Sequence, residues 1–320
     1  MRAAIIDRIG EPPRVGEVED PVRESGQALI QVAAASINPL DLAIASGSYY
    51  GGSPEVPYVP GTEGVGAVLE ADSVSAGTVV RFEARSGRYG SLAERALASE
   101  ETLIELPKAT YNALAAAIGV AGLAAWLALE NRGKLAEGET VLVLGASGAV
   151  GQIAVQAAKI LGAGAVIAAA RSADGLRRAR ELGADATVEL GSHGADELSS
   201  QFREAGGGEI DIVVDPLWGT PAIAALQSLR TGGRLVNLGQ SAGAEAVVSS
   251  AAVRSRSRSI VGHANARTPL DVKRDAYLTL LEHAREGRLT VDFEVIPLEE
   301  ITRAWELQAS SPHRKIVVRP

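Results

Sequence analysis

The most informative absence in this sequence of 320 residues is cysteine, of which there is none. The chain can form no disulfide, thiolate zinc site or iron–sulfur cluster, and it has no cysteine nucleophile. Aromatic residues make up only 4% of the chain, and the formal net charge is −8. Proteins that bind nucleic acids need a basic surface and stacking rings, so we expect no nucleic-acid partner.

Long apolar runs are also scarce. One uncharged run, residues 113–129, reaches the lower length limit for a membrane span, but eight of its 17 residues are alanine and two are glycine. We therefore expect a buried helix there and no membrane partner. The first residues, MRAAIIDRIGEPP, lack the apolar core of a signal peptide, so we expect a cytoplasmic protein.

The sequence falls into two parts with different hydrophobic patterns. Residues 1–110 show short apolar or alternating stretches separated by Gly, Pro, Ser and Asp, a pattern that predicts β-strands. The expected strands are Ala3–Asp7, Gln27–Ala33, Gly64–Leu69, Thr78–Phe82 and Thr102–Glu105. The stretch 46–61 is rich in proline and glycine and is expected to be a loop.

From about residue 110, apolar stretches alternate with helical patterns, which indicates a parallel sheet covered on both faces. The expected strands are Val141–Leu144, Ala165–Ala170, Ala186–Leu190, Ile210–Asp215 and Arg234–Gly239, and the expected helices between them are Ala149–Leu161, Asp174–Leu182, Asp196–Glu204 and Thr220–Leu229. The last part of the chain predicts a helix over Val272–Glu286, a short helix near Ile301–Leu307 and a strand over Lys315–Val318.

A strand that ends at Leu144 runs directly into glycines at 145, 148 and 151 and then into a helix. Glycine permits a sharp turn and a close approach of the backbone to a pyrophosphate, and the N–H groups at the start of the helix favour its negative charge. This strand–loop–helix context makes a dinucleotide site far more specific than three glycines alone. The expected cofactor-binding residues are Gly145, Ser147, Gly148, Ala149, Val150 and Gly151.

At position 171, 20 residues after Gly151, the chain has Arg171 and then Ser172, where an NAD site usually has an acidic residue. A guanidinium and a hydroxyl suit the 2′-phosphate of NADPH, and a carboxylate would repel it. We therefore expect NADPH rather than NADH as the cofactor. A solvated Arg171 that merely opens the next helix is the alternative.

Several segments, in this order along the chain, resemble the medium-chain dehydrogenase/reductase superfamily, and specifically its zinc-free quinone oxidoreductase branch. They are SINPLDL (36–42), VPGTEGVG (59–66), the apolar run, the glycine loop, ELGADATV (181–188), DIVVDPLWG (211–219) and GGRLVNLGQ (232–240). The resemblance implies an α/β protein with a GroES-like β-barrel catalytic domain, residues 1–115 and 265–320, and a doubly wound parallel-sheet Rossmann domain, residues 116–264. It also implies a homodimer.

Zinc-dependent relatives hold the catalytic metal with a cysteine, with the histidine of a GHE motif and with a further cysteine or acidic residue. Here the matching text is GTE, so Thr62 stands where the histidine would be. The four histidines show no ligand-like spacing. We expect no bound metal, and therefore an acceptor that takes hydride without a Lewis acid, namely a quinone or an α,β-unsaturated carbonyl.

The resemblance implies two catalytic residues. Tyr49, in SGSYY, matches a loop tyrosine near the substrate, where it would donate a hydrogen bond or relay a proton to the reduced acceptor. Asn38, in NPLD, matches a residue that reaches toward the nicotinamide and the substrate. The alternatives are an aromatic side chain that covers the barrel and an Asx-type turn before Pro39.

Further cofactor contacts are expected at the carboxyl ends of strands, where ligands bind in such sheets. By resemblance these are Leu217, Gly239, Gln240 and Ser241. Two positions depart from the family, because Gly175 and Leu190 stand where relatives often have a lysine and a tyrosine near the 2′-phosphate. That departure leaves Arg171 and Ser172 as the main basis for NADPH.

Together these features predict an enzyme, an NADPH-dependent and zinc-independent reductase of small-molecule quinones or α,β-unsaturated carbonyls. A nucleotide-binding protein with a structural or regulatory role and weak reductase activity is the second hypothesis. A zinc-dependent alcohol dehydrogenase is a third and less favoured one.

Overall fold

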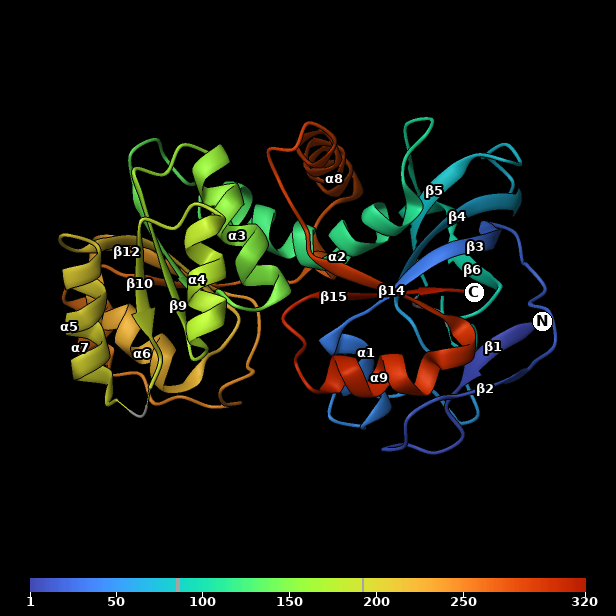
Figure 1. Ribbon diagram of the computed structural model, residues 1–320, viewed down its shortest axis with the longest axis horizontal. Coiled ribbons are helices and arrows are strands. Elements are labelled where there is room, and N and C mark those ends of the chain that lie inside the picture. The colour runs from blue at the N-terminus through green and yellow to red at the C-terminus, as the bar shows by residue number, and fades with distance from the viewer. Residues whose placement is uncertain (85–86, 192) are drawn as a thin grey trace. The chain divides into compact units, whose positions relative to one another are not determined.

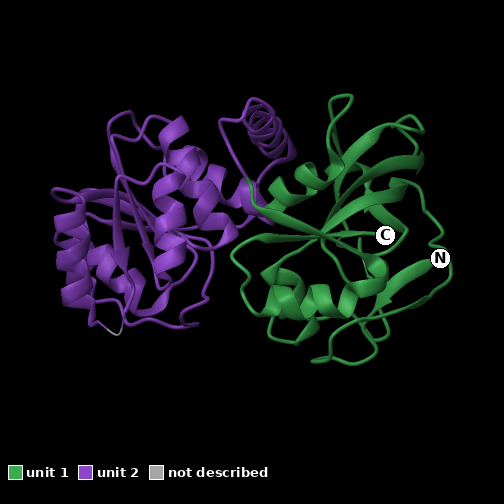
Figure 2. Ribbon diagram, viewed as in Figure 1, with its two compact units in different colours: residues 1–120, 291–320 green, residues 121–290 purple. Residues whose placement is uncertain are grey.

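The computed structural model describes residues 1–84, 87–191 and 193–320 (Figure 1). The chain forms two compact units (Figure 2): unit 1 comprises Met1–Val120 and Val291–Pro320, and unit 2 comprises Ala121–Thr290. The first boundary lies five residues after the expected 115/116. The second differs more from the expected 264/265, because residues 265–290, which include helix α8 (Leu270–Arg285), belong to unit 2. The end of that segment is fixed there by the side chain of Gln156, which accepts from the amide of Thr290 (2.8 Å) and donates to its carbonyl oxygen (2.9 Å).

Unit 1 is built on a seven-stranded sheet with the order β14-β15-β3-β4-β5-β7, in which β6 also pairs with β3. The strands are β3 (Gln27–Ile37), β4 (Glu63–Glu70), β5 (Val79–Glu83), β6 (Arg95–Ser99), β7 (Ile104–Glu105), β14 (Phe293–Pro297) and β15 (Lys315–Arg319). A separate antiparallel pair joins β1 (Arg2–Ile5) and β2 (Arg14–Glu17), and the helical elements are α1 (Pro39–Ala45), η1 (Glu100–Thr102), η4 (Leu298–Glu300) and α9 (Ile301–Ala309). Alternating apolar residues such as Ile30, Phe82 and Ile316 are fully buried and form its core.

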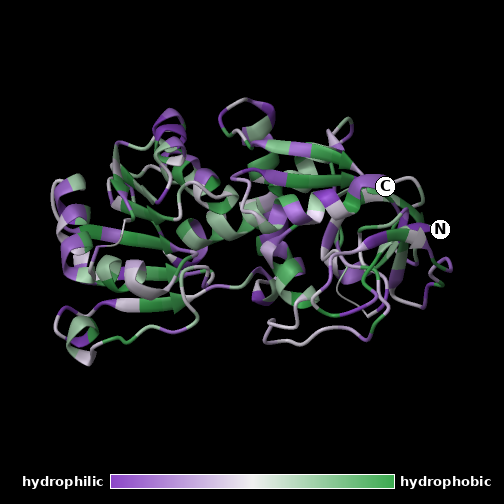
Figure 3. Cartoon of the chain, turned by 60° about the horizontal axis from the view of Figure 1, so that its bottom comes forward, coloured by the Kyte–Doolittle hydropathy of each residue, from purple (hydrophilic) through white to green (hydrophobic). Residues whose placement is uncertain are grey.

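Unit 2 is a six-stranded parallel sheet with the order β10-β9-β8-β11-β12-β13. Its strands are β8 (Thr140–Leu144), β9 (Ala165–Ala170), β10 (Ala186–Glu189), β11 (Ile210–Asp215), β12 (Leu229–Asn237) and β13 (Ser259–Gly262), and its other helical elements are α3 (Ala149–Ile160), α4 (Ala173–Glu181), α5 (Ala195–Ala205), α6 (Gly219–Ser228), α7 (Ser250–Arg254) and η3 (Asn265–Arg267). The central strands are mainly apolar, whereas the helices are mixed (Figure 3). The strand order reverses between β8 and β11, which is where ligands bind in doubly wound sheets. The expected α/β class is confirmed.

Helix α2 (Asn112–Leu127), continued by η2 (Ala128–Arg132), contains the apolar run. Its composition and length would allow a membrane span, but 78% of its most apolar window is buried within the protein, as in a core helix. The expected single helix is wrong in one respect, because Gly119 (φ 3°, ψ −123°) breaks it. A Cβ on Gly119 would lie 2.3 Å from Oε2 of Glu63, which accepts a hydrogen bond from the Val120 amide (2.8 Å).

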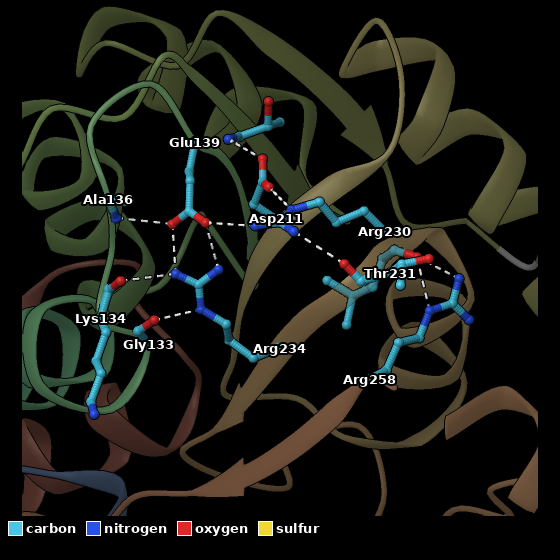
Figure 4. Close-up of polar contacts among 11 residues, drawn as sticks. Gly133, Lys134, Ala136, Glu139, Asp211, Arg230, Thr231, Arg234 and Arg258 are labelled. Carbon is cyan, nitrogen blue, oxygen red and sulfur yellow. Dashed lines mark hydrogen bonds and ion pairs between the residues drawn. The ribbon is translucent and has the colours of Figure 1, made fainter. Parts of the chain in front are cut away.

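Charged side chains tie together the amino ends of three neighbouring strands of unit 2 (Figure 4). Glu139, just before β8, accepts hydrogen bonds from Arg234 Nη1 (2.7 Å) and Nη2 (2.5 Å) on β12, and Asp211 of β11 pairs with Arg230. Burial alone would raise the pKa of Glu139, but hydrogen bonds from Arg234 and from the Ala136 amide outweigh it and hold the pKa below its ordinary value. This cluster lies at the sheet edge opposite the strand ends that bind ligands, so we assign it to stability.

Candidate cofactor and active site

The three glycines of the loop between β8 and α3 have different structural roles. Gly145 has a φ of +62°, a left-handed conformation that favours glycine. A Cβ on Gly151 would lie 2.3 Å from the carbonyl oxygen of Gly145 and 2.6 Å from Cα of Ala146, so the first turn of α3 packs directly on the loop backbone. A Cβ on Gly148 would meet only the Gly145 oxygen, at 3.5 Å, which leaves this part of the backbone open to a ligand. The N–H groups of the first turn of α3 have no helical partners of their own.

The turn after β9 carries a cation without a partner. In the described part of the chain, Arg171 is exposed and has no hydrogen bond or ion pair. Ser172 is the N-cap of α4, and its Oγ accepts from the amide of Gly175 (3.2 Å). Asp174, the nearest carboxylate in the sequence, is paired with Arg177 (2.8 Å). The guanidinium of Arg171 is therefore available to an anion.

Helix α4 begins in contact with the glycine loop. A Cβ on Gly175 would lie 2.3 Å from Cβ of Ser147, so no side chain fits at position 175 without opening this contact. The amide of Ala146 donates to the carbonyl oxygen of Ala169 (3.0 Å), which aligns the loop with the end of β9. Leu190 is 6% exposed and belongs to the core of unit 2. The two departures from the family are thus packing residues here, and the turn at 171–172 is held beside the loop.

The turn after β11 is held by Asp215, whose side chain is fully buried. Its Oδ1 accepts from the amides of Leu217 (2.9 Å) and Trp218 (2.8 Å), and its Oδ2 accepts from Nδ2 of Asn237 on β12 (2.9 Å). Burial raises the pKa of Asp215, although these hydrogen bonds oppose the rise. Trp218 has a φ of +59°, a strained conformation for a residue with a side chain, which typically costs about 1–3 kcal/mol.

This turn and the loop after β12 meet the glycine loop at the point where the strand order reverses. A Cβ on Gly145 would lie 3.1 Å from the side chain of Leu217 and 3.2 Å from that of Pro216. The carbonyl oxygen of Pro216 accepts from the amide of Ser241 (3.3 Å). The structure therefore brings to one edge of the sheet the glycine loop and the residues expected after β11 and β12, namely Leu217, Gly239, Gln240 and Ser241.

In unit 1, Asn38 lies between β3 and α1 and is 2% exposed. Its Nδ2 donates to Oε1 of Glu63 (2.9 Å), and its Oδ1 accepts from Nζ of Lys315 (2.6 Å). Its backbone amide donates to Oδ2 of Asp41 (2.7 Å). The side-chain amide is therefore held between a carboxylate and an ammonium group, both buried.

Glu63 is the centre of this buried cluster. Its carboxylate is 1% exposed and accepts from Asn38, from the Val120 amide (2.8 and 3.0 Å) and from Nη2 of Arg81 (3.3 Å). Arg81 also donates to Glu83 through Nη1 (2.9 Å). Each buried charge in the cluster thus has at least one opposite charge or polar partner, as burial requires.

Two titratable groups of the cluster are strongly affected by burial. Burial raises the pKa of Asp41 to about 6, and the charge of Glu63 adds to the rise, while the hydrogen bond from the Asn38 amide opposes it. Burial lowers the pKa of Lys315, although Glu63 and Asp41 act in the opposite direction. Thr62, at the position of the histidine in zinc-dependent relatives, is also buried.

Tyr49 lies in the loop after α1 and is partly buried, whereas Tyr50 beside it is 90% exposed. The two rings are tilted by 47° with centroids 4.5 Å apart. A Cβ on Gly51 would lie 2.4 Å from the Tyr49 ring, so the ring covers that stretch of backbone. Asn38 and Tyr49 stand at opposite ends of α1, and the catalytic role of each remains a prediction.

Comparison with known proteins identifies the family to which this chain belongs. Residues 149–282 match the model of a zinc-binding dehydrogenase, and residues 24–108 match that of the alcohol dehydrogenase GroES-like domain. Over 249 residues the chain is 34% identical to the quinone oxidoreductase of Lama guanicoe, covering 75% of this chain and 73% of that protein. The chain belongs to the medium-chain dehydrogenase/reductase superfamily. Within that superfamily it is quinone oxidoreductase-like, and it is an oxidoreductase.

Solved structures of this superfamily agree in fold over the whole length. The quinone oxidoreductase of Thermus thermophilus, solved alone and with NADPH, is 29% identical, with a TM-score of 0.81 and coverage of 100% of both chains. A probable oxidoreductase from Mycobacterium abscessus is also 29% identical, with a TM-score of 0.85 and coverage of 100% of this chain and 99% of that one. The expected GroES-like domain and Rossmann domain are confirmed.

The superfamily includes zinc enzymes, so the residues that could bind a metal need a separate account. Within residues 1–84, 87–191 and 193–320, no three His, Cys, Asp or Glu side chains are grouped in a way that could hold a metal ion. Lys315, Arg81 and Glu63 were not expected to be site residues. A signal was present, because Arg81 lies within the strand stretch VVRFE and Lys315 begins the stretch KIVVR, and both stretches are mainly apolar.

Proposed function

We propose that this chain is an NADPH-dependent, zinc-independent reductase that transfers a hydride to a quinone or an α,β-unsaturated carbonyl. The observation that carries the proposal is the guanidinium of Arg171, which has no partner among the described residues and is held beside the glycine loop by the contact of α4 with Ser147. A cation at this position favours a 2′-phosphate, which distinguishes NADPH from NADH. The solved complex of the Thermus thermophilus quinone oxidoreductase with NADPH supports this choice.

The residues present fit the cofactor. Because Gly151 has no Cβ, the start of α3 packs directly against the loop. The unpartnered N–H groups at the start of the helix would hold the pyrophosphate there. The residues that would hold the cofactor are Gly145, Ser147, Gly148, Ala149, Val150, Gly151, Arg171, Ser172, Leu217, Gly239, Gln240 and Ser241. When bound, NADPH supplies a hydride from C4 of its nicotinamide.

The choice of acceptor follows from the residue at the zinc position. Thr62 replaces the histidine of zinc-dependent relatives, and the chain has no cysteine to complete such a site. Without a Lewis acid, simple ketones are poor acceptors, whereas quinones and conjugated carbonyls accept hydride readily. Asn38 and Tyr49 would donate hydrogen bonds to the acceptor oxygen as negative charge develops there, and Tyr49 would pass it a proton.

The test is cofactor oxidation by the purified protein with a panel of quinones and enones, together with binding of NADPH and NADH. Arg171→Ala should raise the Kd for NADPH about tenfold or more, since a hydrogen bond to a charged group contributes about 1.5–3 kcal/mol. The Kd for NADH should change by less than about twofold. Arg178→Ala, which removes a cation of the same helix that is paired with Glu181, is the matched control.

Tight NADPH binding without oxidation by any acceptor would favour the second hypothesis, a nucleotide-binding protein with a structural or regulatory role. Equal losses of NADPH and NADH affinity in Arg171→Ala would remove the basis for the NADPH preference. Stoichiometric zinc in the active protein, measured by elemental analysis, would refute the zinc-independent mechanism and restore the alcohol dehydrogenase hypothesis.

We also propose that the protein is a cytoplasmic homodimer. Strand β13 ends the sheet of unit 2, and Ile260 within it is 38% exposed, so an edge is available for pairing with a second copy. Light scattering after gel filtration should give twice the chain mass of 33.0 kDa. A pure monomer would contradict the dimer without affecting the proposed reaction.

A further inference from the structure

Asn38 is held at both ends of its side-chain amide by groups of opposite charge. The ammonium of Lys315 lies 2.6 Å from Oδ1, and the carboxylate of Glu63 lies 2.9 Å from Nδ2. All three side chains are at most 3% exposed. An ammonium group can only donate and a carboxylate can only accept, so together they permit one of the two orientations of the amide.

Burying the ammonium group of Lys315 would be unfavourable in free energy if the residue served only to pack β15. The strand places Lys315 next to the apolar residues Ile316, Val317 and Val318, all fully buried, and an apolar side chain would pack there without loss of hydration. β15 pairs with β3 in a register that sets Ile316 opposite Ile37, which brings Lys315 beside Asn38. Within the described residues, Nζ has its short hydrogen bond to Asn38 and a longer one, 3.4 Å, to the carbonyl oxygen of Ile37.

The other side of the amide is fixed as firmly. Glu63 cannot turn away from Asn38 without breaking its hydrogen bonds with the Val120 amide and with Arg81. One hydrogen of Nδ2 is used by Glu63, which leaves the second hydrogen as the donor that Asn38 could offer. Since Asn38 is 2% exposed, only a group packed directly against the amide could receive it.

We propose that Lys315 is a positioning residue of the reduction, which holds the Asn38 amide so that its second N–H points to the acceptor oxygen. Glu63 acts with it from the opposite end. This inference rests on the proposed function, in which Asn38 contacts the acceptor. An ammonium at Oδ1 also withdraws electrons from the amide, which makes the remaining N–H a stronger donor.

The test is a double-mutant cycle of Asn38→Ala and Lys315→Met. Lys315→Met alone should lower kcat for a quinone about tenfold, while the Kd for NADPH stays within about twofold. In the Asn38→Ala background, Lys315→Met should change kcat by less than about twofold, because its effect passes through Asn38. Lys159→Met, which removes a partly exposed lysine paired with Asp185, is the matched control and should leave kcat unchanged.

A second readout uses the protein without cofactor or acceptor. In protein labelled with 15N-asparagine, the side-chain NH2 signal of Asn38, assigned by its loss in Asn38→Ala, should exchange slowly with water. In Lys315→Met that exchange should accelerate about tenfold or more, because the amide is no longer held. If Lys315→Met does not fold, Glu63→Gln releases the other end of the amide and should show the same acceleration and the same lack of additivity with Asn38→Ala.

The outcomes separate the two proposals. If the wild-type protein oxidises NADPH with none of the acceptors, the proposed function fails, and the exchange experiment still reports whether Lys315 holds Asn38. If the wild-type protein turns over but kcat losses of Lys315→Met and Asn38→Ala multiply, Lys315 does not act through Asn38 and this inference is overturned. An unchanged kcat in Lys315→Met overturns it as well.

Discussion

The tight contact between the glycine loop and α3 makes Gly151→Ala a sharp test of the site. The added Cβ would lie 2.3 Å and 2.6 Å from two backbone atoms, and ordinary carbon contacts are about 3.5 Å or more, so the loop would have to retreat by about 1 Å. Such overpacking costs about 1–3 kcal/mol. In the absence of the contact, Gly→Ala in the first turn of a helix would instead stabilise the protein by about 0.4–1 kcal/mol.

The two cases therefore predict opposite changes in the free energy of unfolding. With the contact, the melting temperature of the protein without cofactor should fall by about 2–12 °C, at about 2–4 °C per kcal/mol for a unit of this size. Gly148→Ala is the matched control, because its Cβ meets only one atom, at an ordinary 3.5 Å, and its φ of −77° suits alanine. We expect both variants to weaken NADPH binding, since both alter the loop, but only Gly151→Ala to unfold earlier. A higher melting temperature for Gly151→Ala, measured by calorimetry, would refute the packing argument.

Two further predictions concern charged groups that are buried or partly buried. Because the pKa of Asp41 is raised from 3.8 to about 6, the folded protein keeps a proton that the unfolded chain releases between these pH values, so stability falls as pH rises through this window, by up to about 3 kcal/mol. Urea unfolding at several pH values should show this decline in the wild type and a flatter profile in Asp41→Asn, and parallel profiles would contradict it. Arg234→Met should lower the free energy of unfolding by about 1.5–3 kcal/mol, because the partly buried carboxylate of Glu139 loses both hydrogen bonds from that guanidinium and keeps only those from Arg230 and the Ala136 amide. Lys134→Met is a control for loss of charge near that cluster, and equal effects of the two variants would argue against the pair.

The sequence predicted the fold well where local pattern and packing agree. Continuous apolar stretches gave β8, β9 and β11 nearly to the residue, because strands covered on both faces are apolar over most of their length. The break of α2 at Gly119 could not be predicted in the same way. Its cause is the carboxylate of Glu63, which lies 57 residues from Val120 in the sequence and takes the hydrogen bond of that amide.

The same distinction between local pattern and long-range contact applies to the candidate site. The glycine loop is a local motif, so its residues could be identified from spacing alone, and Gly151 shows the expected close packing. The cluster around Asn38 joins β3, β4, β5 and β15, and no local pattern indicates which buried charges will meet. A charged residue in an apolar strand, such as Arg81 or Lys315, signals only that some partner exists.

The strained turn at Trp218 gives the protein an optical probe of its own. The chain has three tryptophans, and the other two, Trp126 and Trp305, are buried in the interior. With those two replaced by phenylalanine, the emission would come from a single indole next to the carboxyl edge of the parallel sheet. Reduced nicotinamide absorbs where tryptophan emits, so quenching of this one fluorophore would follow the arrival and departure of the dinucleotide in real time, without any label.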